Sequence, residues 1–179
     1  MPPYQTMLYF AYGSNMSTRR LQQRVPSACA LQPAVLQGHR LTFHKVGRDG
    51  SAKCDAALSR DDRDRVHGVL YRMDPRHKPR LDDIEGLGRG YEQKSVTVRL
   101  ADGTESLAIT FYATHVDPTL QPYPWYLEHV LRGARENRLP DHYQAAIALV
   151  QTVDDPDPHR HAMELAIYPH PAPAASTTE

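Results

Sequence analysis

The sequence lacks the features of a secreted or membrane-spanning protein. No segment approaches the ~18 consecutive apolar residues that a membrane span requires, and residues 1–10 contain no basic leader followed by an apolar run. Cysteine is scarce, since Cys29 and Cys54 are the only two. They could pair, but without a secretory signal we expect reduced packing residues. These absences predict a cytoplasmic protein.

Net charge is lacking as well. Lys plus Arg and Asp plus Glu both number 21 among the 179 residues. The chain therefore has no overall field to attract a nucleic acid or an anionic membrane, and we expect neither as a partner. A composition of 40% hydrophobic and 23% charged residues is ordinary for a globular protein, and the length fits one domain. A homodimer stays an open alternative.

The hydrophobic pattern predicts an α+β fold, with a mixed sheet curled into a small β-barrel and helices packed around it. The Asp102-Gly103 pair between two alternating runs predicts a hairpin, and Ser17 or Thr18 is the expected cap of the first helix. Residues 60–65 are expected to form a solvated hairpin tip. Strands are predicted at 7–11, 34–45, 54–58, 66–73, 93–100 and 105–113, and helices at 19–24, 75–84, 125–137 and 142–150.

The C-terminal part of the chain has a different composition. Residues 154–160 are rich in proline and charge, and residues 170–179 consist of His, Pro, Ala, Ser, Thr and one acid. Such segments bury little apolar surface, so we expect the last part to be disordered or loosely attached. The predicted organisation is a domain over residues 1–153 and an extension over residues 154–179.

The Tyr12-Gly13-Ser14-Asn15 segment follows a predicted buried strand and precedes a helix. Glycine allows a sharp turn and a close approach of the backbone to a ligand. Consecutive amides ahead of a helix attract a carboxylate or a developing oxyanion. The alternative is a plain strand-to-helix turn, in which Ser14 and Asn15 hydrogen-bond to the local backbone.

Glu85 is the predicted proton-transfer group. It ends a helix whose buried side carries Leu81 and Ile84, and a glycine-rich turn follows. The negative end of the helix dipole and partial burial both disfavour a carboxylate there relative to the neutral acid. A group with both forms accessible suits general acid–base chemistry. The alternative is an exposed surface acid.

Other residues give weaker signals. Tyrosines can bury a ring while offering a hydroxyl to a ligand, or simply pack; the candidates are Tyr9, Tyr12, Tyr91, Tyr112 and Tyr126. His159 and His161 lack the i, i+4 spacing of zinc enzymes, so no metal site is expected there. No nucleophile elbow, phosphate loop or dinucleotide fingerprint is found, and no cofactor is expected.

Three segments together resemble the γ-glutamylcyclotransferase family. Leu-Tyr-Phe-Ala-Tyr-Gly-Ser-Asn at residues 8–15 looks like the family's substrate loop. Leu-Asp-Asp-Ile-Glu-Gly at residues 81–86 places Glu85 where the family's catalytic acid lies. Residues 133–140 resemble the segment after the helix that carries a substrate-contacting tyrosine, which on this alignment is Tyr126. The resemblance spans roughly residues 7–150.

The resemblance implies a small β-barrel with flanking helices and an enzyme that closes a γ-glutamyl group into 5-oxoproline. The α-amino group attacks its own γ-carbonyl, an intramolecular step with a large kinetic advantage, and Glu85 is implied as the general base and then acid. The partner would be a small γ-glutamyl molecule, without metal or nucleotide. The implied substrate-binding residues are Tyr9, Phe10, Ala11, Tyr12, Gly13, Ser14, Asn15, Tyr91, Tyr112 and Tyr126.

Rival interpretations stay open. The γ-glutamylamine branch of the family generally carries Tyr-Gly-Thr-Leu in the loop, so Ser14-Asn15 fits the γ-glutamyl-amino-acid branch better. A member dedicated to a specialised γ-glutamyl metabolite would differ in its leaving-group pocket. A non-catalytic small-molecule-binding module on the same fold is the alternative outside enzymology. A purely structural protein would leave the combination of loop, glutamate and tyrosine unexplained.

Overall fold

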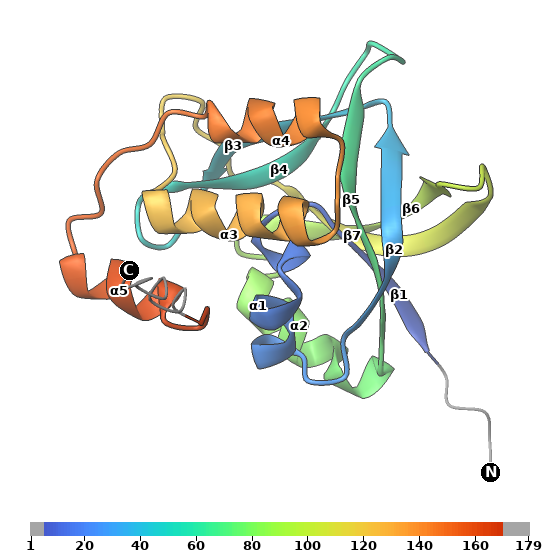
Figure 1. Cartoon of the computed structure of the whole chain (residues 1–179), viewed down its shortest axis with the longest axis horizontal. Coiled ribbons are helices and arrows are strands. Elements are labelled where there is room, and N and C mark those ends of the chain that lie inside the picture. Colours follow the sequence, from blue (N-terminus) through green and yellow to red (C-terminus); the bar gives the residue numbers. More distant parts are fainter. Residues whose placement is uncertain (1–5, 170–179) are drawn as a thin grey trace, which may run out of the picture.

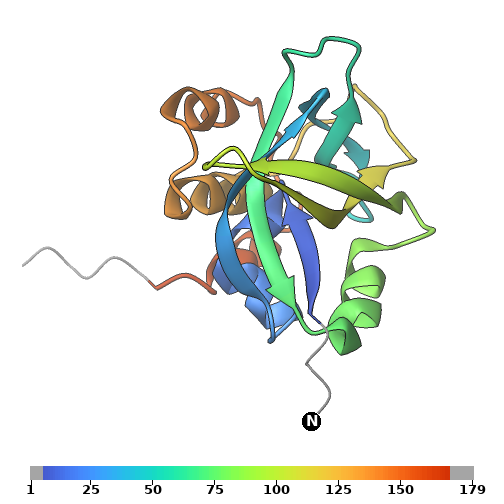
Figure 2. The ribbon, with the colours of Figure 1, turned by 90° about the vertical axis from the view of Figure 1, so that its right-hand side faces the viewer.

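The computed structural model describes residues 6–169, and its centre is a closed five-stranded barrel. The strand order is β1 (Met7–Ala11), β5 (Arg65–Met73), β2 (Cys29–Gln37), β6 (Tyr91–Leu100) and β7 (Glu105–Ala113). Neighbours run antiparallel except at the closure, where β1 meets β7 in parallel at Tyr9 and Ile109. Figures 1 and 2 show this barrel from two sides, and the predicted fold class is confirmed.

A two-stranded sheet, β3 (His39–Val46) with β4 (Ala52–Leu58), extends from the barrel. Gly38, at a φ of +67°, joins β2 to β3, so β2–β3 forms one long arm that pairs with β5 and β4. A left-handed φ of this kind favours glycine. The expected hairpin tip at residues 60–65 is wrong, because β4 pairs with β3 while β5 pairs with β1 and β2. A polar stretch such as residues 60–65 is typical both of a hairpin turn and of a loop between two sheets, so the sequence alone does not distinguish them.

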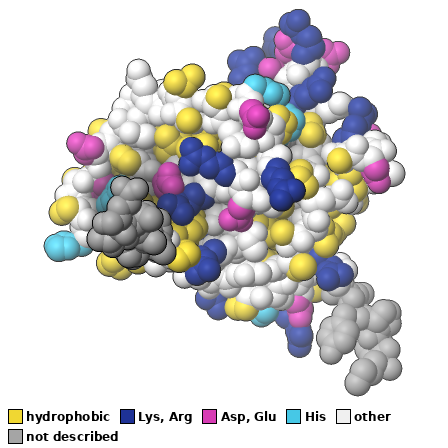
Figure 3. All heavy atoms as spheres, in the orientation of Figure 1, with side chains coloured by type: hydrophobic (Ala, Val, Ile, Leu, Met, Phe, Trp, Pro, Cys, Tyr) yellow, Lys and Arg dark blue, Asp and Glu magenta, His cyan; other side chains and the backbone are white. Residues whose placement is uncertain are grey.

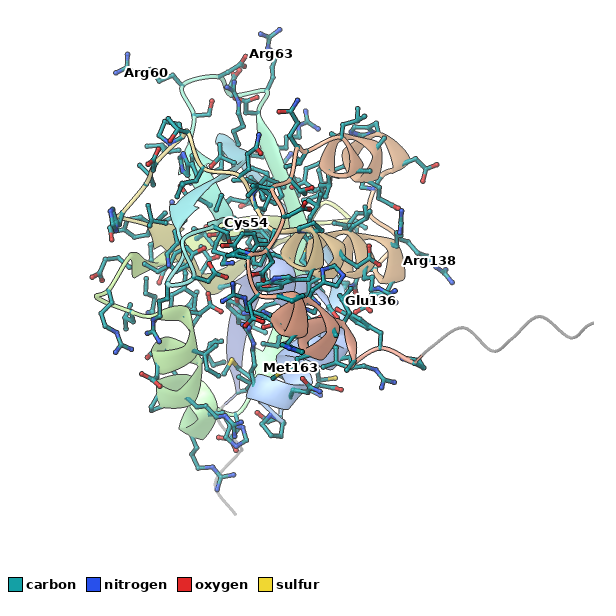
Figure 4. The ribbon with its side chains drawn as sticks, turned by 90° about the vertical axis from the view of Figure 1, so that its left-hand side faces the viewer. Cys54, Arg60, Arg63, Glu136, Arg138 and Met163 are labelled. Carbon is teal, nitrogen blue, oxygen red and sulfur yellow. The ribbon has the colours of Figure 1, made fainter. Side chains whose placement is uncertain are left out.

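The loop of residues 59–64 projects from the top of the molecule, where Figure 4 labels Arg60 and Arg63. Its charges pair locally: Arg63 contacts Asp61 at 2.8 Å, and Asp64 accepts from Arg40 at 2.8 Å. Figure 3 shows both signs of charge at this tip and mixed across the rest of the visible face. Local pairing of this kind agrees with a solvated loop.

The helices lie on one side and one end of the barrel (Figure 1). Ser17 accepts a hydrogen bond from the backbone N–H of Arg20, which confirms it as the cap of α1. Gly103, at a φ of +85°, turns the chain between β6 and β7, so the predicted hairpin is confirmed. The elements are η1 (Ser14–Met16), α1 (Thr18–Arg24), η2 (Pro75–His77), α2 (Lys78–Glu85), α3 (Pro124–Glu136), α4 (Asp141–Ala148) and α5 (Pro158–Leu165).

The described part of the C-terminal extension packs against the domain. Asp157 caps α5 by accepting from the backbone N–H groups of His159 and Arg160. Beyond the helix, the buried Tyr168 hydroxyl contacts His129 of α3 and donates to Ser17. The segment expected to be disordered, residues 170–179, lies outside the described residues. Among residues 6–169, no helix is long and apolar enough to cross a membrane.

Helix α3 approaches η1 so closely that only glycine fits between them. A Cβ on Gly133 would lie 2.5 Å from the carbonyl carbon of Met16 and 2.5 Å from the backbone nitrogen of Ser17. The Asn137 side chain adds a hydrogen bond to the Met16 carbonyl at 3.0 Å. The segment of residues 133–137 therefore fixes the position of the loop at the end of β1.

We expect Gly133→Ala to lower the free energy of unfolding by about 1–3 kcal/mol, because the new methyl group overpacks this contact. The sign is diagnostic, since glycine to alanine inside a helix otherwise stabilises by about 1 kcal/mol. Urea denaturation measures the change, and Arg135→Ala on the exposed side of α3 serves as the control, expected within about 0.5 kcal/mol. A raised stability in Gly133→Ala would contradict the close-approach account.

Candidate active site

The loop after β1 lines a cavity between the barrel and α3. A Cβ on Gly13 would stand 3.0 Å from the Cβ of Cys54 and 3.4 Å from the Tyr126 hydroxyl, so the backbone approaches both because no side chain intervenes. Figure 4 places Cys54 in the middle of the molecule. Ser14 and Asn15 begin η1, and the first N–H groups of a helix have no acceptor within it.

Glu85 stands at the end of α2, immediately before Gly86, whose φ of +73° terminates the helix. Its Oε1 accepts a hydrogen bond of 2.7 Å from the Asn15 side-chain amide and lies 3.7 Å from Nη1 of Arg24. The Arg24 guanidinium also donates to Oδ1 of Asn15 at 3.1 Å. The Glu85 side chain is only 16% exposed, so it is not the free surface acid of the alternative interpretation.

Arg24 and Asn15 stabilise the negative charge of Glu85. The helix dipole and burial, the two effects considered from sequence, both oppose that charge. Burial in turn lowers the pKa of Arg24, although Glu85 acts in the opposite direction. The two side chains form a partly buried pair in which Asn15 contacts both partners.

Two of the tyrosines use their hydroxyl protons to hold the backbone. The Tyr12 hydroxyl donates to the Phe111 carbonyl at 2.6 Å, and the Tyr91 hydroxyl donates to the Cys54 carbonyl. Burial raises the pKa of both phenols well above the usual value, so both stay neutral. These hydroxyls act as structural ties between the cavity walls.

Two other tyrosines accept hydrogen bonds, which leaves their protons available. The Tyr9 hydroxyl accepts from the Asn15 amide at 3.1 Å, and the Tyr126 hydroxyl accepts from the Cys54 backbone N–H at 2.9 Å. Neither hydroxyl donates to an oxygen or nitrogen acceptor among residues 6–169. Burial raises the pKa of both phenols. Each can therefore donate a hydrogen bond to a bound molecule.

The cavity has an inner and an outer part. The inner part, about 30 Å³, is lined by Tyr9, Tyr12, Gly13, Ser14, Asn15, Cys54, Glu85, Tyr91, Phe111 and Tyr126. The outer part, about 320 Å³, shares with it Ser14, Glu85, Tyr91 and Tyr126. These four residues mark the junction, so Glu85 can contact a molecule that occupies both parts.

Three of the predicted binding residues lie elsewhere. Phe10 and Ala11 are fully buried in the core and line neither part of the cavity. Tyr112 lies under the ammonium of Lys94, while its neighbour Phe111 lines the inner cavity. Successive side chains of a strand point to opposite faces, so a sequence motif read as one block includes residues of both faces.

The basic lining of the outer cavity was missed from sequence. Its charged residues are Arg20, Arg24, Lys45, Arg48, Lys53 and Arg89, with Asp49, Glu85 and Glu164 as the acids. They come from α1, from β3 and β4 and the turn between them, from the loop after α2, and from α5. No short motif contains them, and only the tertiary structure brings them together.

The C-terminal helix contributes Glu164 to this wall. Its Oε2 lies 2.5 Å from Nη1 of Arg20 and 3.1 Å from Nε2 of the fully buried His129. Burial lowers the pKa of His129 to about 4, which Glu164 only partly offsets. Burial also opposes the charge of Glu164, but the nearby His129 and Arg20 lower the pKa of Glu164 to about 2.

Known proteins resemble this chain in sequence and fold. A model of the AIG2-like family matches residues 65–147. γ-Glutamylcyclotransferase of Mus musculus is 32% identical over 151 residues, which cover 82% of this chain and 80% of that protein. The Homo sapiens enzyme is 32% identical over 157 residues, covering 86% and 83%.

The solved structures agree. One titled γ-glutamyl cyclotransferase has a TM-score of 0.81 at 27% identity, and the match covers 90% of this chain and 99% of that one. The chain belongs to the γ-glutamylcyclotransferase family.

The buried His129 and its neighbour Glu164 in α5 predict that the protein loses stability in acid. Because the pKa of His129 is about 4 when folded and about 6.5 when unfolded, the unfolded chain binds an extra proton as the pH falls from 6.5 to 4. The free energy of unfolding should fall over this window by at most about 1.4 kcal/mol per pH unit from this group. Glu164, with its lowered pKa, adds a loss from about pH 4.5 down to 2.

Urea denaturation at several pH values measures this effect against His129→Gln, which stays neutral. The variant should lose less stability than the wild type between pH 6.5 and 4, although His39 and His67, whose pKa values burial also lowers, keep some slope. His161→Gln, on the exposed side of α5, should follow the wild-type curve. Parallel curves for wild type and His129→Gln would refute the assignment.

Proposed function

We propose that the chain is a γ-glutamylcyclotransferase that converts a γ-glutamyl amide into 5-oxoproline and the free amine. The observation that carries this proposal is the place of Glu85: a mostly buried carboxylate at the junction of the two cavity parts, bound by Asn15 and Arg24. Its relatives named γ-glutamylcyclotransferase support the reaction class.

The reaction needs one carboxylate to move two protons in turn, because the α-ammonium carries three protons and the lactam nitrogen of 5-oxoproline carries one. The α-ammonium of a γ-glutamyl amide has a pKa of about 8 and is mostly not nucleophilic at neutral pH. Glu85 takes its proton, and the freed nitrogen attacks the γ-carbonyl carbon to form the C–N bond of a five-membered ring. Glu85 returns this proton to the departing nitrogen as the tetrahedral intermediate collapses and the amide C–N bond breaks. It then takes the second proton from the ring nitrogen, which leaves the neutral lactam, and passes it to the released amine, which departs as an ammonium ion.

The loop and the tyrosines have supporting roles in this proposal. The backbone N–H groups of Ser14 and Asn15 lack acceptors within η1 and would donate to the oxyanion of the intermediate. The hydroxyl of Tyr126, 3.4 Å from the Cβ position of Gly13, would bind the glutamyl group. The side-chain amide of Asn15 holds the Glu85 carboxylate in place through a hydrogen bond.

We also propose that the protein works in the cytoplasm. Its thiols support this: Cys29, which is exposed, and Cys54, which is buried, are both unpaired. Reduced cysteines are typical of reducing compartments.

Glu85→Gln should lower the rate of 5-oxoproline formation from L-γ-glutamyl-L-alanine by about 10²- to 10⁴-fold, since the amide cannot transfer the proton. Chromatography of the products measures both 5-oxoproline and glutamate. Asp83→Asn is the matched control: this acid lies in the same helix, but its side chain is 79% exposed and pairs with Arg89 on the surface. Its rate should stay within about twofold of the wild type.

Three outcomes would contradict the proposal. Glutamate in place of 5-oxoproline would make water the nucleophile and the protein a hydrolase. Full activity in Glu85→Gln would assign the proton transfer to another group. No product from any γ-glutamyl substrate, together with binding of the substrate, would favour the non-catalytic module.

A further inference from the structure

The outer cavity contains more cations than its acids can pair. Arg20 pairs with Glu164 at 2.5 Å, and Lys53 pairs with Asp49 at 2.8 Å. The third acid of the lining, Glu85, is shared between Asn15 and Arg24. Each of the three acids that line the cavity therefore already has a partner, and none is left to pair with the other cations.

Three cations of the lining remain. Arg89 contacts Asp83, a surface acid outside the cavity, at 2.8 Å. Lys45 and Arg48 have no carboxylate within 4.0 Å and no side-chain hydrogen bond among residues 6–169. The outer cavity thus contains two positive charges without an acidic partner among residues 6–169.

Lys45 is the stronger observation of the two, because it is only 6% exposed. Its ammonium lies 4.6 Å from the centre of the Tyr91 ring and against Gly90, where a Cβ would stand 3.3 Å from Nζ. Burial lowers its pKa, although Glu85 acts in the opposite direction. A buried cation without a hydrogen-bonded anion is costly, and a fold retains one where a ligand completes the pair.

The two cations flank the reacting position. Tyr91, under Lys45, lines both parts of the cavity, and Nη2 of Arg48 comes within 3.5 Å of the Cβ position of Gly86, the residue after Glu85. Lys45 and Arg48 line only the outer part, whereas the loop that would bind the glutamyl group lines the inner part. With the amide bond at Glu85, the amine to be released extends toward the two cations.

We propose that Lys45 and Arg48 form an anion subsite for the released amine, which makes γ-glutamyl conjugates of acidic amino acids the preferred substrates. The inference rests on the proposed function. Lys45 binds the α-carboxylate of the released amino acid, and the exposed Arg48 binds the side-chain carboxylate at the cavity mouth. No step of the reaction changes, since the subsite acts on binding and orientation.

The test compares three substrates whose released amines carry two, one and no carboxylates: γ-glutamyl-aspartate, γ-glutamyl-alanine and γ-glutamyl-alaninamide. In the wild type, kcat/KM should fall in that order, by about tenfold or more for loss of the carboxylate at Lys45. Lys45→Met should reduce the ratio for alanine over alaninamide by about 10- to 100-fold, and Lys45→Arg should restore most of it. Arg48→Met should reduce mainly the ratio for aspartate over alanine.

Lys94→Met is the matched control. Like Lys45, Lys94 lies over a tyrosine ring of the β6–β7 hairpin, at 5.3 Å from Tyr112, and burial lowers its pKa, but it contacts His39 and lines neither part of the cavity. Its substrate ratios should equal those of the wild type. Thermal unfolding of each variant shows whether a change in kinetics reflects a loss of folded protein.

Binding measurements separate this inference from the proposed function. By calorimetry, L-aspartate should bind the wild type more tightly than L-alaninamide, and Lys45→Met should remove the difference whether or not turnover occurs. 5-Oxoproline carries only the glutamyl carboxylate, so its affinity should not change in Lys45→Met. An equal loss for all three substrates, with weaker binding of 5-oxoproline, would place Lys45 at the glutamyl group and overturn the proposal. Equal binding of aspartate and alaninamide to the wild type would also overturn it.

Discussion

The side-chain amide of Asn15 is the contact on which the rest of the site depends. It donates to Glu85 and to the Tyr9 hydroxyl, and its oxygen accepts from Arg24, so one residue joins β1, α1 and the end of α2. An amide suits this place because it donates and accepts at once, which no carboxylate or hydrocarbon can do. The loop that contains it is in turn held by the contact of Gly133 with Met16.

Much of the fold could be predicted from local signals. The Asp102-Gly103 turn, the Ser17 cap and the strand over residues 7–11 each depend on residues next to one another in sequence. The pairing of β4 could not, because a polar turn at residues 60–65 does not reveal which strands it separates. Pairing is set by the long arm of β2 and β3 through Gly38, which is a tertiary arrangement.

The site divides in the same way. Tyr9, Gly13 and Asn15 are close in sequence, and Glu85 follows from the family resemblance, so sequence placed them in one cavity. The basic wall, including Arg24 and Lys45, comes from separate elements and follows only from the folded chain. Sequence also could not separate the roles of the tyrosines, because whether a hydroxyl donates or accepts depends on the backbone groups that face it.

The two parts of the cavity differ in the elements that form them, because only the outer part includes a residue of α5. The inner part is lined by residues of the barrel strands, the loop after β1, η1, β4, α2 and α3, where a change in one residue disturbs many contacts. The outer wall includes Glu164, on a segment that joins the domain at its end and is held mainly by Arg20, His129 and Ser17. Changes at the end of the chain can therefore reshape the wall of the outer cavity without altering the ring-closing residues.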